Sequence, residues 1–537
     1  MNRRQFLGIG TASLLPIEFL AGCGGTKRIS TDVCVYGGNA SGVMAAVSAA
    51  KEGCRVFIIE PSRWLGGMTG GGLMHIDWGQ KDAVGGMTRS VLNDDHDDAT
   101  YRKIFQELVE KHSIPVFFEH RVESVQKVEG RIESITLEYA PPDKLGCPIG
   151  RAKRSEAVRV TAPIFIDCSY EGDLMAKSGV AYTYGREAAE EYGESLGGVA
   201  PNMAEYEVDP YVTPGDRRSG YLPLLQDRVM GPLGSADKLT MGYGFRWKFA
   251  EGEGSLPIGT LEDYDPRMFE VYRRAFQGKV NLAGARIRKL GSREPEQGHM
   301  YAMGSGNLSR SILAPAVFGS NQGYPNGDWE ERAKIWKFHQ VFLGGMTHFL
   351  RVDSSARTDL KEKAKTIGFQ RGSFDETQGW PHQLYVREAR RMISRYVVTQ
   401  KDLEGKSDPS DSVALASYGV DDWPYAMFPL NGKIALNGGM YSRVCLNEAN
   451  RGIYKIPYRS ITPRKEECEN LIVPVCCSAS HVAMTSIRME PVWMMLGESA
   501  GVAASMAIQE RSAVQEIGDV ALREKLKERG QILERPT

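Results

Sequence analysis

Two stretches of the chain gather the residue types that could do chemistry. A histidine can take a proton from a hydroxyl or C–H group, and paired arginines suit a carboxylate, a phosphate or an acidic sugar. The first stretch, GWPHQLYVREARRM at residues 379–392, concentrates such groups: Trp380, His382, Tyr385, Arg387 and Arg391. We take His382, Tyr385 and Arg387 as candidate catalytic residues.

A helix over residues 384–398 would position this first stretch. It would bring Arg387 and Arg391 to one face, four residues apart, and leave His382 at the helix entry. The alternative is a structural, ion-paired helix in which Glu388 pairs with Arg391.

The second stretch is SASHVAMTSIRMEP at residues 478–491, and it supplies Ser480, His481, Ser486, Arg488 and Glu490. We expect a polar loop over 478–488, followed by a long helix that starts at Met489 or Glu490 with a proline in its first turn. His481 and Arg488 join the catalytic candidates, although His481 could equally be a loop histidine with satisfied hydrogen bonds.

The elements that would position these groups begin near the N-terminus. Val33–Tyr36 and residues 55–60 read as buried parallel strands, and residues 40–52 between them as a helix. Gly37 and Gly42 match the ends of the pattern G-x-G-x-x-G, while Asn39 takes its middle place. Backbone N–H groups at such a turn can reach a pyrophosphate, and an acid such as Glu60 can accept both ribose hydroxyls. The alternative is an ordinary βαβ turn without a ligand.

Later segments extend this nucleotide-binding half. WLGGMTGGG follows the ribose acid at residues 64–72, whereas an NAD domain would normally continue into another strand. We predict strands over 115–122 and 162–167, a meander over 123–160 and a short helix over 174–178. A buried strand over 471–475 would return to this half, with the long C-terminal helix behind it. A second helix over residues 329–350 would belong to a large insert.

Several of these segments together resemble a known family. VYGGNASGVMAA, WLGGMTGGG, IDCSYEGDLMAKSG, GWPHQLYVREARRM, IPYRSI and SASHVAMTSIRMEPVWMMLGESAGVAA are similar to the bacterial FAD-dependent oxidoreductases, often labelled xanthan lyase or grouped with the flavin subunit of heterodisulfide reductase. The resemblance runs from about Thr31 to Gln509. It implies an α/β fold, with a Rossmann-like FAD-binding domain of the two-dinucleotide-binding-domain type and a large inserted α+β substrate domain. In that family Asn or Thr often replaces the middle glycine, as Asn39 does here.

The resemblance also implies FAD as the cofactor and a set of contacts to it. The implied positions are Gly37, Gly38, Asn39, Ala40, Ser41, Gly42, Glu60, Pro61, Gly66, Gly67, Met68, Thr69, Val122, Asp167, Asp173, Ser480, Glu490, Gly497 and Gly501. Val122 would touch the adenine through its backbone, and the helix that starts near Glu490 would direct its N-terminus at the flavin. Asp173 would face the flavin region or cap the helix over 174–178. The family's usual Asp-Ser-His triplet is replaced here by Asp421-Asp422-Trp423, so the resemblance does not identify the substrate.

The first thirty residues resemble targeting signals rather than part of the folded domain. Arg3-Arg4 before Phe6-Leu7 resembles a twin-arginine export signal, and LAGC at residues 20–23 resembles a lipoprotein cleavage box with Cys23 as the lipid-anchored end. The alternative is a frayed cytosolic leader. We therefore expect an exported, lipid-anchored protein of the periplasm or cell envelope. We expect residues 1–30 to be the export signal and lipoprotein cleavage box. Residues 31–190 and 457–510 would form the FAD-binding domain, 191–456 the inserted substrate domain, and 511–537 a charged helical tail.

Composition and motif counts argue against nucleic-acid binding, metal sites and a built-in NAD(P)H site. The formal net charge of −1 gives no basic field for nucleic acid. Nine cysteines occur without a C-x-x-C pair, so we expect no zinc, iron–sulfur or other metal site. The sequence contains no second G-x-G-x-x-G unit that could form an NAD(P)H site. We therefore expect an external electron acceptor, whose identity the sequence does not give.

Three functions remain open. The first is oxidation of a small organic or carbohydrate-derived substrate, with hydride passing to flavin N5 and His382 or His481 taking the proton. The second is a polysaccharide lyase for anionic glycans, served by His382, Tyr385 and Arg387. The third is a non-catalytic, flavin-bearing surface protein that binds glycans.

Overall fold

The computed structural model describes residues 18–21, 27–201, 203–259, 262–278, 287–290, 300–303, 312, 314, 316–439, 441–442 and 451–535. The predicted twin-arginine pair and Cys23 lie outside these residues. Within the described part of the chain, no helix is long and apolar enough to cross a membrane.

A five-stranded parallel sheet in the order β24-β9-β3-β4-β5 forms the centre of the nucleotide-binding half. Its strands are β3 (Val33–Tyr36), β4 (Val56–Glu60), β5 (Val116–Phe118), β9 (Ile164–Asp167) and β24 (Leu471–Ile472). Nearly every residue of β3, β4 and β9 is buried, as expected for a parallel sheet covered on both faces. The predicted Rossmann-like fold class is confirmed.

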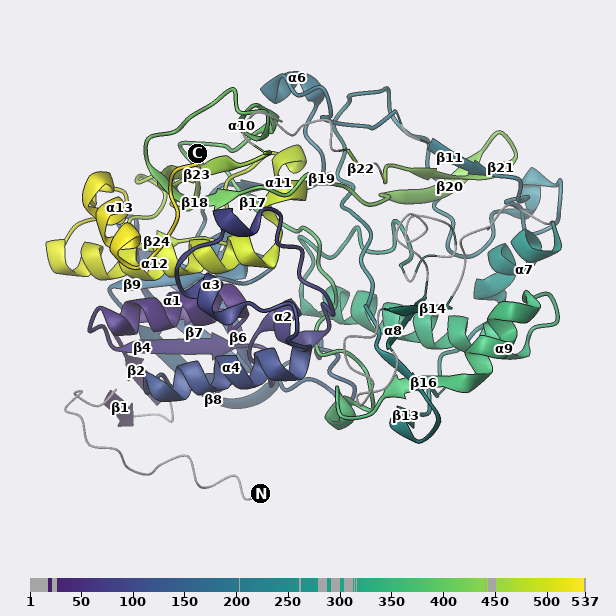
Figure 1. The fold of residues 1–537 in the computed structure, drawn as a ribbon, viewed down its shortest axis with the longest axis horizontal. Helices are drawn as coiled ribbons and strands as arrows, with labels where there is room; N and C mark the ends of the chain where they lie inside the picture. Colours follow the sequence, from purple (N-terminus) through teal and green to yellow (C-terminus); the bar gives the residue numbers. More distant parts are fainter. Residues whose placement is uncertain are drawn as a thin grey trace.

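Two helices from opposite ends of the sequence pack against each other on this sheet (Figure 1). They are α1 (Ala40–Lys51) and α12 (Glu490–Glu510). A Cβ atom on Gly497 would lie 2.2 Å from the Ser41 carbonyl oxygen, and one on Gly501 would lie 2.2 Å from that of Ala45. Only glycine allows this approach. Gly497 and Gly501, predicted as cofactor contacts, therefore face α1 instead.

A second sheet covers the other side in the order β1-β2-β8-β7-β6. Its strands are β1 (Glu18–Ala21), β2 (Lys27–Ser30), β6 (His120–Val128), β7 (Arg131–Tyr139) and β8 (Lys153–Thr161). The predicted meander is confirmed, but the fold starts before Thr31, because β2 pairs in parallel with β8. The strand predicted over 115–122 divides at Glu119, whose φ of 63° breaks the extended chain, so β5 and β6 join different sheets.

Helices near the glycine-rich segment complete this half: α2 (Gly67–Gly71), α3 (Gly86–Val91), α4 (Asp98–Lys111) and α5 (Asp173–Lys177). In the C-terminal part α11 (His481–Ile487) precedes α12, and α13 (Asp519–Glu528) follows it. The start of α12 at Glu490 with Pro491 in its first turn agrees with the prediction. The loop predicted over 478–488 is wrong, because Ser480 caps a short helix there through Ala483 N–H.

The other half of the molecule contains smaller sheets and a helical layer. Its longest element is α8 (Trp329–Val352), which confirms the helix predicted over 329–350. The remaining helices are α6 (Ala189–Tyr192), α7 (Glu270–Gln277), α9 (Thr358–Thr366) and α10 (Gln400–Leu403). The remaining strands are β10 (Tyr182–Thr183), β11 (Met203–Tyr206), β12 (Phe249–Glu251), β13 (Ser255–Leu256), β14 (Ile287–Leu290), β15 (Met300–Met303), β16 (Ile367–Gln370), β17 (Arg391–Met392), β18 (Ser412–Ala416), β19 (Val420–Asp421), β20 (Ala426–Leu430), β21 (Lys433–Asn437), β22 (Tyr441–Ser442) and β23 (Tyr454–Pro457). Of these, β18 and β23 pair with each other, and β18 packs on α12, in the nucleotide-binding half.

The helix predicted over residues 384–398 is wrong. Residues 384–390 are an irregular segment, and β17 follows, paired with Tyr182–Thr183. The backbone N–H of Tyr385 donates to Gly244 at 2.9 Å, and that of Met392 donates to Cys476 at 2.9 Å. These partners lie far away in the sequence, so tertiary pairing overrides the local helical pattern.

Candidate functional site

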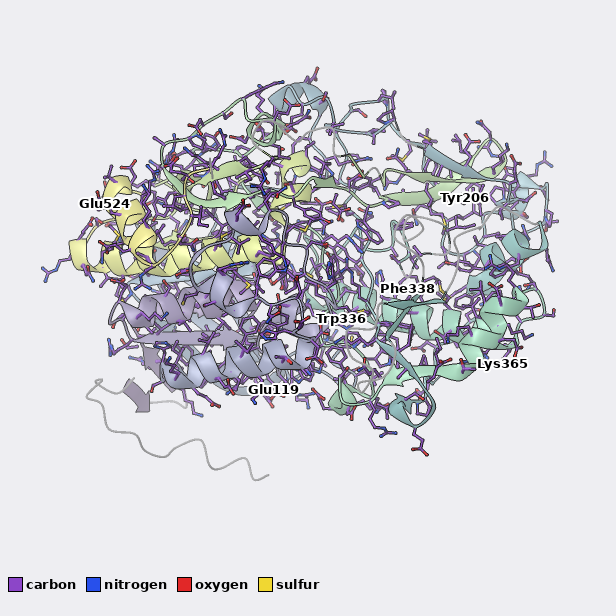
Figure 2. All side chains as sticks on the ribbon, viewed as in Figure 1. Glu119, Tyr206, Trp336, Phe338, Lys365 and Glu524 are labelled. Atoms are coloured by element: carbon purple, nitrogen blue, oxygen red, sulfur yellow. The ribbon has the colours of Figure 1, made fainter. Side chains whose placement is uncertain are left out.

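A cavity opens where the strands β3 and β4 end, between the two halves of the molecule. We call it the first cavity; its walls include Gly37, Asn39, Glu60, Pro61, Ser62, Gly67, Tyr170, Glu171, Trp336, His382 and Gln383. Trp336 comes from α8, near the middle of the molecule (Figure 2). The first cavity thus lies at the carboxyl ends of parallel strands, where open α/β sheets bind ligands.

The turn after β3 has the geometry of a dinucleotide-binding turn. Gly37 has a φ of 96°, and a Cβ atom there would lie 2.8 Å from Ser169 N. A Cβ atom on Gly42 would lie 1.9 Å from the Gly37 carbonyl oxygen. Neither position accepts a larger residue without moving backbone.

The side chain of Asn39, which replaces the middle glycine, has a structural role. Its side-chain oxygen accepts a hydrogen bond from Gly42 N at 2.9 Å and so caps α1. Its side-chain nitrogen donates to the Cys168 carbonyl, in the loop after β9. One residue therefore fixes the helix N-terminus and joins it to the neighbouring strand's loop.

Glu60 ends β4 and forms one wall of the first cavity. Its carboxylate accepts hydrogen bonds from Gly38 N at 2.6 Å and from Ser62 N at 2.7 Å. Burial raises the pKa of Glu60, and these two donors oppose that rise. Each carboxylate oxygen keeps a lone pair for a further donor, as a ribose hydroxyl would need.

The glycine-rich segment packs directly on this turn. Gly66 N donates to the Gly38 carbonyl at 2.8 Å, and Met68 N donates to the Tyr170 hydroxyl at 2.9 Å. A Cβ atom on Gly67 would lie 2.4 Å from that hydroxyl. The segment is therefore held close to the cavity by backbone contacts that need glycine.

Glu490, the first residue of α12, joins this segment to the C-terminal part of the chain. Its carboxyl accepts hydrogen bonds from Thr69 Oγ1 at 2.6 Å and from the Tyr170 hydroxyl at 2.9 Å. Burial raises the pKa of Glu490 to about 7. Segments separated by more than four hundred residues thus meet at one carboxyl group, as the sequence predicted.

His382 lies at the first cavity, beside the glycine-rich segment. Its ring stacks on Trp64 with centroids 3.7 Å apart, and its Nε2 lies 2.8 Å from Glu376 Oε1. Both ring nitrogens are buried, and neither makes a hydrogen bond of good geometry among the described residues. Burial lowers the pKa of His382, although Glu376 opposes the shift. The ring is therefore neutral near pH 7 and can accept a proton.

Tyr385 is surrounded by arginines. Arg488 Nη1 lies 3.2 Å from its hydroxyl, and the guanidiniums of Arg246 and Arg387 lie 4.8 and 4.3 Å from its ring centroid. We call Tyr385 and these three residues the arginine cluster. It brings together three predicted site residues, Tyr385, Arg387 and Arg488, with one that the sequence did not single out.

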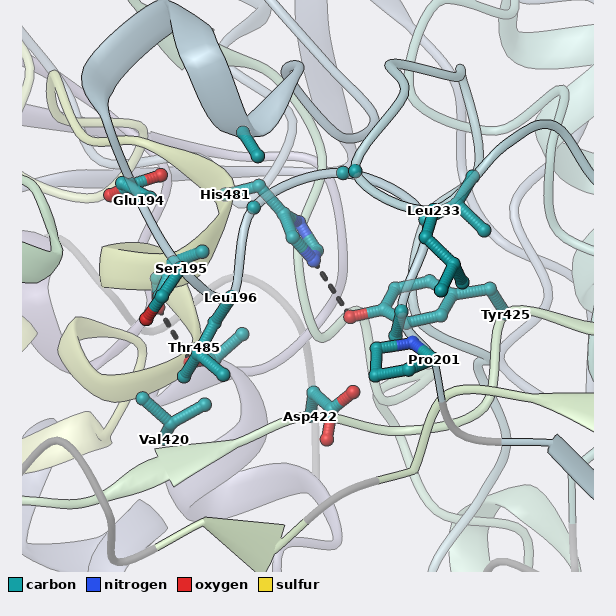
Figure 3. Close-up of a pocket in the computed structure, with 17 residues that line it drawn as sticks. Glu194, Ser195, Leu196, Pro201, Leu233, Val420, Asp422, Tyr425, His481 and Thr485 are labelled. Carbon is teal, nitrogen blue, oxygen red and sulfur yellow. Dashed lines mark hydrogen bonds between the residues drawn. The ribbon is translucent and has the colours of Figure 1, made fainter.

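His481 lies elsewhere, at a second cavity of about 340 Å³ (Figure 3). Its Nε2 lies 2.7 Å from the Tyr425 hydroxyl, and its Nδ1 lies 2.8 Å from Glu388 Oε2. The walls also include Glu194, Leu196, Leu233, Asp422 and Thr485. Both ring nitrogens are thus engaged, and α11 separates His481 from Arg488 by about 10 Å at 1.5 Å per residue.

Four further predicted cofactor contacts have other partners in the structure. Asp173 bonds Arg332 at 2.6 and 2.9 Å and Arg390 at 2.8 Å; burial alone would raise its pKa, but the two arginines hold it well below the usual value. It starts α5 but does not cap it, since Gly172 is the N-cap. Asp167 accepts from Ser169 N in the loop that follows it and from Met175 N in α5. Val122 is a buried ladder residue of β6, and Ser480 caps α11 and donates to Glu194.

The remaining predicted cofactor residues gather at one place. Gly37, Asn39, Glu60, Pro61 and Gly67 line the first cavity, and Gly38, Ala40, Ser41, Gly42, Gly66, Met68, Thr69 and Glu490 belong to the segments that build its walls. Sequence reasoning missed Tyr170, Arg246 and the Glu388–His481–Tyr425 contact. For Tyr170 a signal existed, because it lies in the predicted turn after β9. Nothing local marks Arg246.

No group of three or more His, Cys, Asp or Glu side chains that could hold a metal occurs among the described residues.

The chain is similar to one known family and to several solved structures. A family model described as FAD dependent oxidoreductase matches residues 32–528. A geranylgeranyl bacteriochlorophyll reductase-like protein from Thermoplasma acidophilum is similar at 13% identity over 94% of this chain and 85% of that one, with a TM-score of 0.32. A search of curated proteins gave no significant match.

Two other solved structures are similar over smaller shares of the chain. THI4 of Thermovibrio ammonificans is 19% identical over 29% of this chain, with a TM-score of 0.23, and the match spans 66% of that chain. Thioredoxin reductase of T. acidophilum is 18% identical over 30% of this chain and 40% of that one, with a TM-score of 0.18. The matches therefore span less than two thirds of these two relatives. Because the family model matches nearly the whole chain and the first cavity carries a dinucleotide-binding turn, the protein belongs to the FAD-dependent oxidoreductase family and uses FAD as its cofactor.

Proposed function

We propose that this protein is an exported flavoenzyme that oxidises a small organic or carbohydrate-derived substrate at the inner end of the first cavity. The observation that carries the proposal is the junction at Glu490, where the glycine-rich segment, the loop after β9 and the start of α12 share one carboxyl group. When bound, FAD supplies the two-electron acceptor for the substrate's hydride. All other tasks fall to the chain's own residues.

The residues present fit the cofactor. The turn Gly37–Gly42 and the N-terminus of α1 would hold the pyrophosphate, since helix N-termini stabilise anions. Glu60 would accept the ribose hydroxyls and would repel a 2′-phosphate. Gly67 and the start of α12 would hold the flavin half, where bulkier residues would intrude.

His382 is the proposed proton acceptor. It lines the first cavity, is neutral near pH 7, and has a buried Nδ1 without a protein partner. His481 is the weaker candidate, because Glu388 and Tyr425 occupy both its ring nitrogens and a whole helix separates it from Arg488. Proton transfer by a side chain requires contact or one bridging water, which favours the residue at the cavity.

The direct test is an anaerobic screen of the purified protein for compounds that bleach the flavin absorbance. The panel contains sugars, sugar acids, hydroxy acids and amines. The proposal predicts that one class bleaches the flavin and that air or an added acceptor restores the colour. Bound FAD that no compound reduces, in a protein that strong reductants do bleach, would contradict it.

One observation also favours a lyase. A tyrosine beside several arginines is what elimination from a uronic acid needs, since the arginines neutralise the carboxylate. The same screen separates the two functions when anionic glycans are added. A lyase forms unsaturated, ultraviolet-absorbing products while the flavin stays oxidised.

Export and lipid anchoring at Cys23 remain part of this proposal and rest on the sequence of the first 23 residues. Cys23→Ala should move the protein from the membrane fraction to the soluble fraction of the envelope. An unchanged distribution would remove the anchor from the account.

A further inference from the structure

We propose that the substrate carries a carboxylate, which binds between Arg246, Arg387 and Arg488. This inference rests on the proposed function, because it names the class of substrate that the enzyme oxidises. The observations that carry it are an excess of buried positive charge and two buried N–H groups without acceptors.

The arginine cluster holds more positive than negative charge. Arg488 pairs with Asp421 at 2.8 Å, and Asp77 adds negative potential there. Among the described residues neither Arg246 nor Arg387 has a carboxylate partner, and their printed hydrogen bonds go to the backbone carbonyls of Leu73 and Gly242.

Arg387 is the least compensated of the three. It is 3% exposed and lies between the rings of Tyr385 and Trp423, at 4.3 and 3.7 Å from their centroids. Burial, together with the neighbouring guanidiniums of Arg488 and Arg246, lowers the pKa of Arg387 to about 9, although Tyr385 and Asp421 oppose the shift. A buried cation without a counter-ion is costly, so the site favours an incoming anion.

Two orphan donors indicate the kind of anion. The Nε atoms of Arg387 and Arg488 are buried and have no hydrogen-bond partner among the described residues. Two donors match the two oxygens of a carboxylate, which guanidiniums bind in a planar arrangement. A phosphate, with three terminal oxygens and more charge, would need more free donors than these.

The position of the cluster suits a substrate of the first cavity. Arg488 lies two residues before Glu490, which bonds Thr69. Arg246 donates to Leu73 at 3.1 Å, just after the glycine-rich segment. Gly71 lies next to His382 and Gln383, so residues 382–387 lead from the cavity to the cluster. A carboxylate held there would place the rest of the substrate toward the cofactor.

The test compares the full-length wild type with Arg387→Met, which keeps the volume but removes the charge, and with Arg459→Met as the control. Arg459 is partly exposed, bonds the buried Asp411 at 2.9 Å and is not part of the cluster. Thermal unfolding is followed in sodium acetate, phosphate and chloride at equal ionic strength, and the FAD content of each protein is measured. We expect acetate to raise the melting temperature of the wild type and of Arg459→Met but not that of Arg387→Met.

Without acetate, Arg387→Met should be at least as stable as the wild type, because it removes an uncompensated buried charge. A purely structural arginine would give the opposite result. In the bleaching screen, each acid is paired with its neutral amide or alcohol, and the acid should be preferred. Its apparent affinity should fall about 100-fold in Arg387→Met, the usual loss when one partner of a buried charge pair is removed.

An acetate effect that survives in Arg387→Met, a larger effect of phosphate than of acetate, or equal bleaching by acid and amide would overturn the inference. These outcomes leave the proposed function intact if FAD is bound and reduced. Conversely, a protein that binds no FAD refutes the proposed function, while the acetate measurement still reports on the arginine cluster.

Discussion

Replacing Glu490 by glutamine should stabilise the flavin-free protein at pH 8 but hardly at pH 5. The carboxyl is 3% exposed and accepts from two hydroxyl groups, and no cation pairs with it among the described residues. Burial therefore raises its pKa from 4.5 to about 7 in the folded protein. Glutamine keeps the shape and one acceptor but carries no charge.

The sign follows from proton linkage. Since the folded-state pKa is the higher one, the folded state binds more protons between pH 4.5 and 7. The stabilisation from this group is complete below the unfolded pKa and is lost as the pH rises through 7. Between pH 5 and pH 8 the loss amounts to about 2–3 kcal/mol for a group whose pKa moves from 4.5 to about 7.

The assay is urea unfolding at pH 5 and pH 8, followed by tryptophan fluorescence. The quantity of interest is the stability gain from Glu490→Gln at pH 8 minus the gain at pH 5, because other titrating groups cancel in this difference. We expect about 2–3 kcal/mol. Glu510→Gln, at the exposed end of the same helix, is the matched control and should give a difference near zero. A value near zero for Glu490→Gln as well would mean that its carboxyl is solvated or paired, which refutes the reasoning.

Three further changes probe the site and its support. Asp173→Asn leaves the buried Arg332 and its neighbour without a counter-ion and should cost about 3–5 kcal/mol in unfolding free energy; a loss below 1 kcal/mol in denaturant melts would argue against this ion pair. Gly501→Ala should lower stability by about 1–3 kcal/mol because its Cβ would meet the Ala45 carbonyl, whereas Gly518→Ala, at the N-cap of α13 where the nearest atom is 3.8 Å away, should cost less than about 1 kcal/mol. His382→Asn should retain FAD yet slow flavin reduction by about 100-fold or more. Because burial lowers the pKa of His382, the rate of flavin reduction by the wild type should rise with pH through a pKa below 6.5. This rising limb of the pH–rate profile should vanish in the variant. A variant that keeps the limb would show that another group takes the proton.

The parts predictable from sequence are those whose signals are local. The turn at Gly37 and Gly42 joins a buried strand to an alanine-rich helix, and its glycines meet backbone that only glycine tolerates. The start of α12 was marked by Pro491 in its first turn. Gly497 and Gly501 of α12 were singled out as cofactor contacts, but what their lack of a side chain allows in the structure is the close approach of α12 to α1.

The predictions that were wrong concern segments whose structure depends on partners far away in the sequence. Residues 384–398 carry a helical pattern, yet Tyr385 bonds Gly244 and β17 pairs with residues 182–183. Asp173 looked like a cap or a cofactor contact, but its partner Arg332 lies on α8, 159 residues later. Such pairs leave no local signal. The Ser480 cap of α11 did leave one, since a serine precedes an apolar helical repeat there, and it was overlooked.

The central claim is that the glycine turn, Glu60 and the start of α12 hold one FAD molecule between them. The most direct measurement is a crystal structure of the protein with FAD bound. The account predicts one FAD per chain, with its pyrophosphate at the Gly37–Gly42 turn, a ribose on Glu60 and the flavin beside Thr69 and Glu490. A flavin bound away from Thr69 and Glu490, or a protein that takes up no FAD, would contradict it.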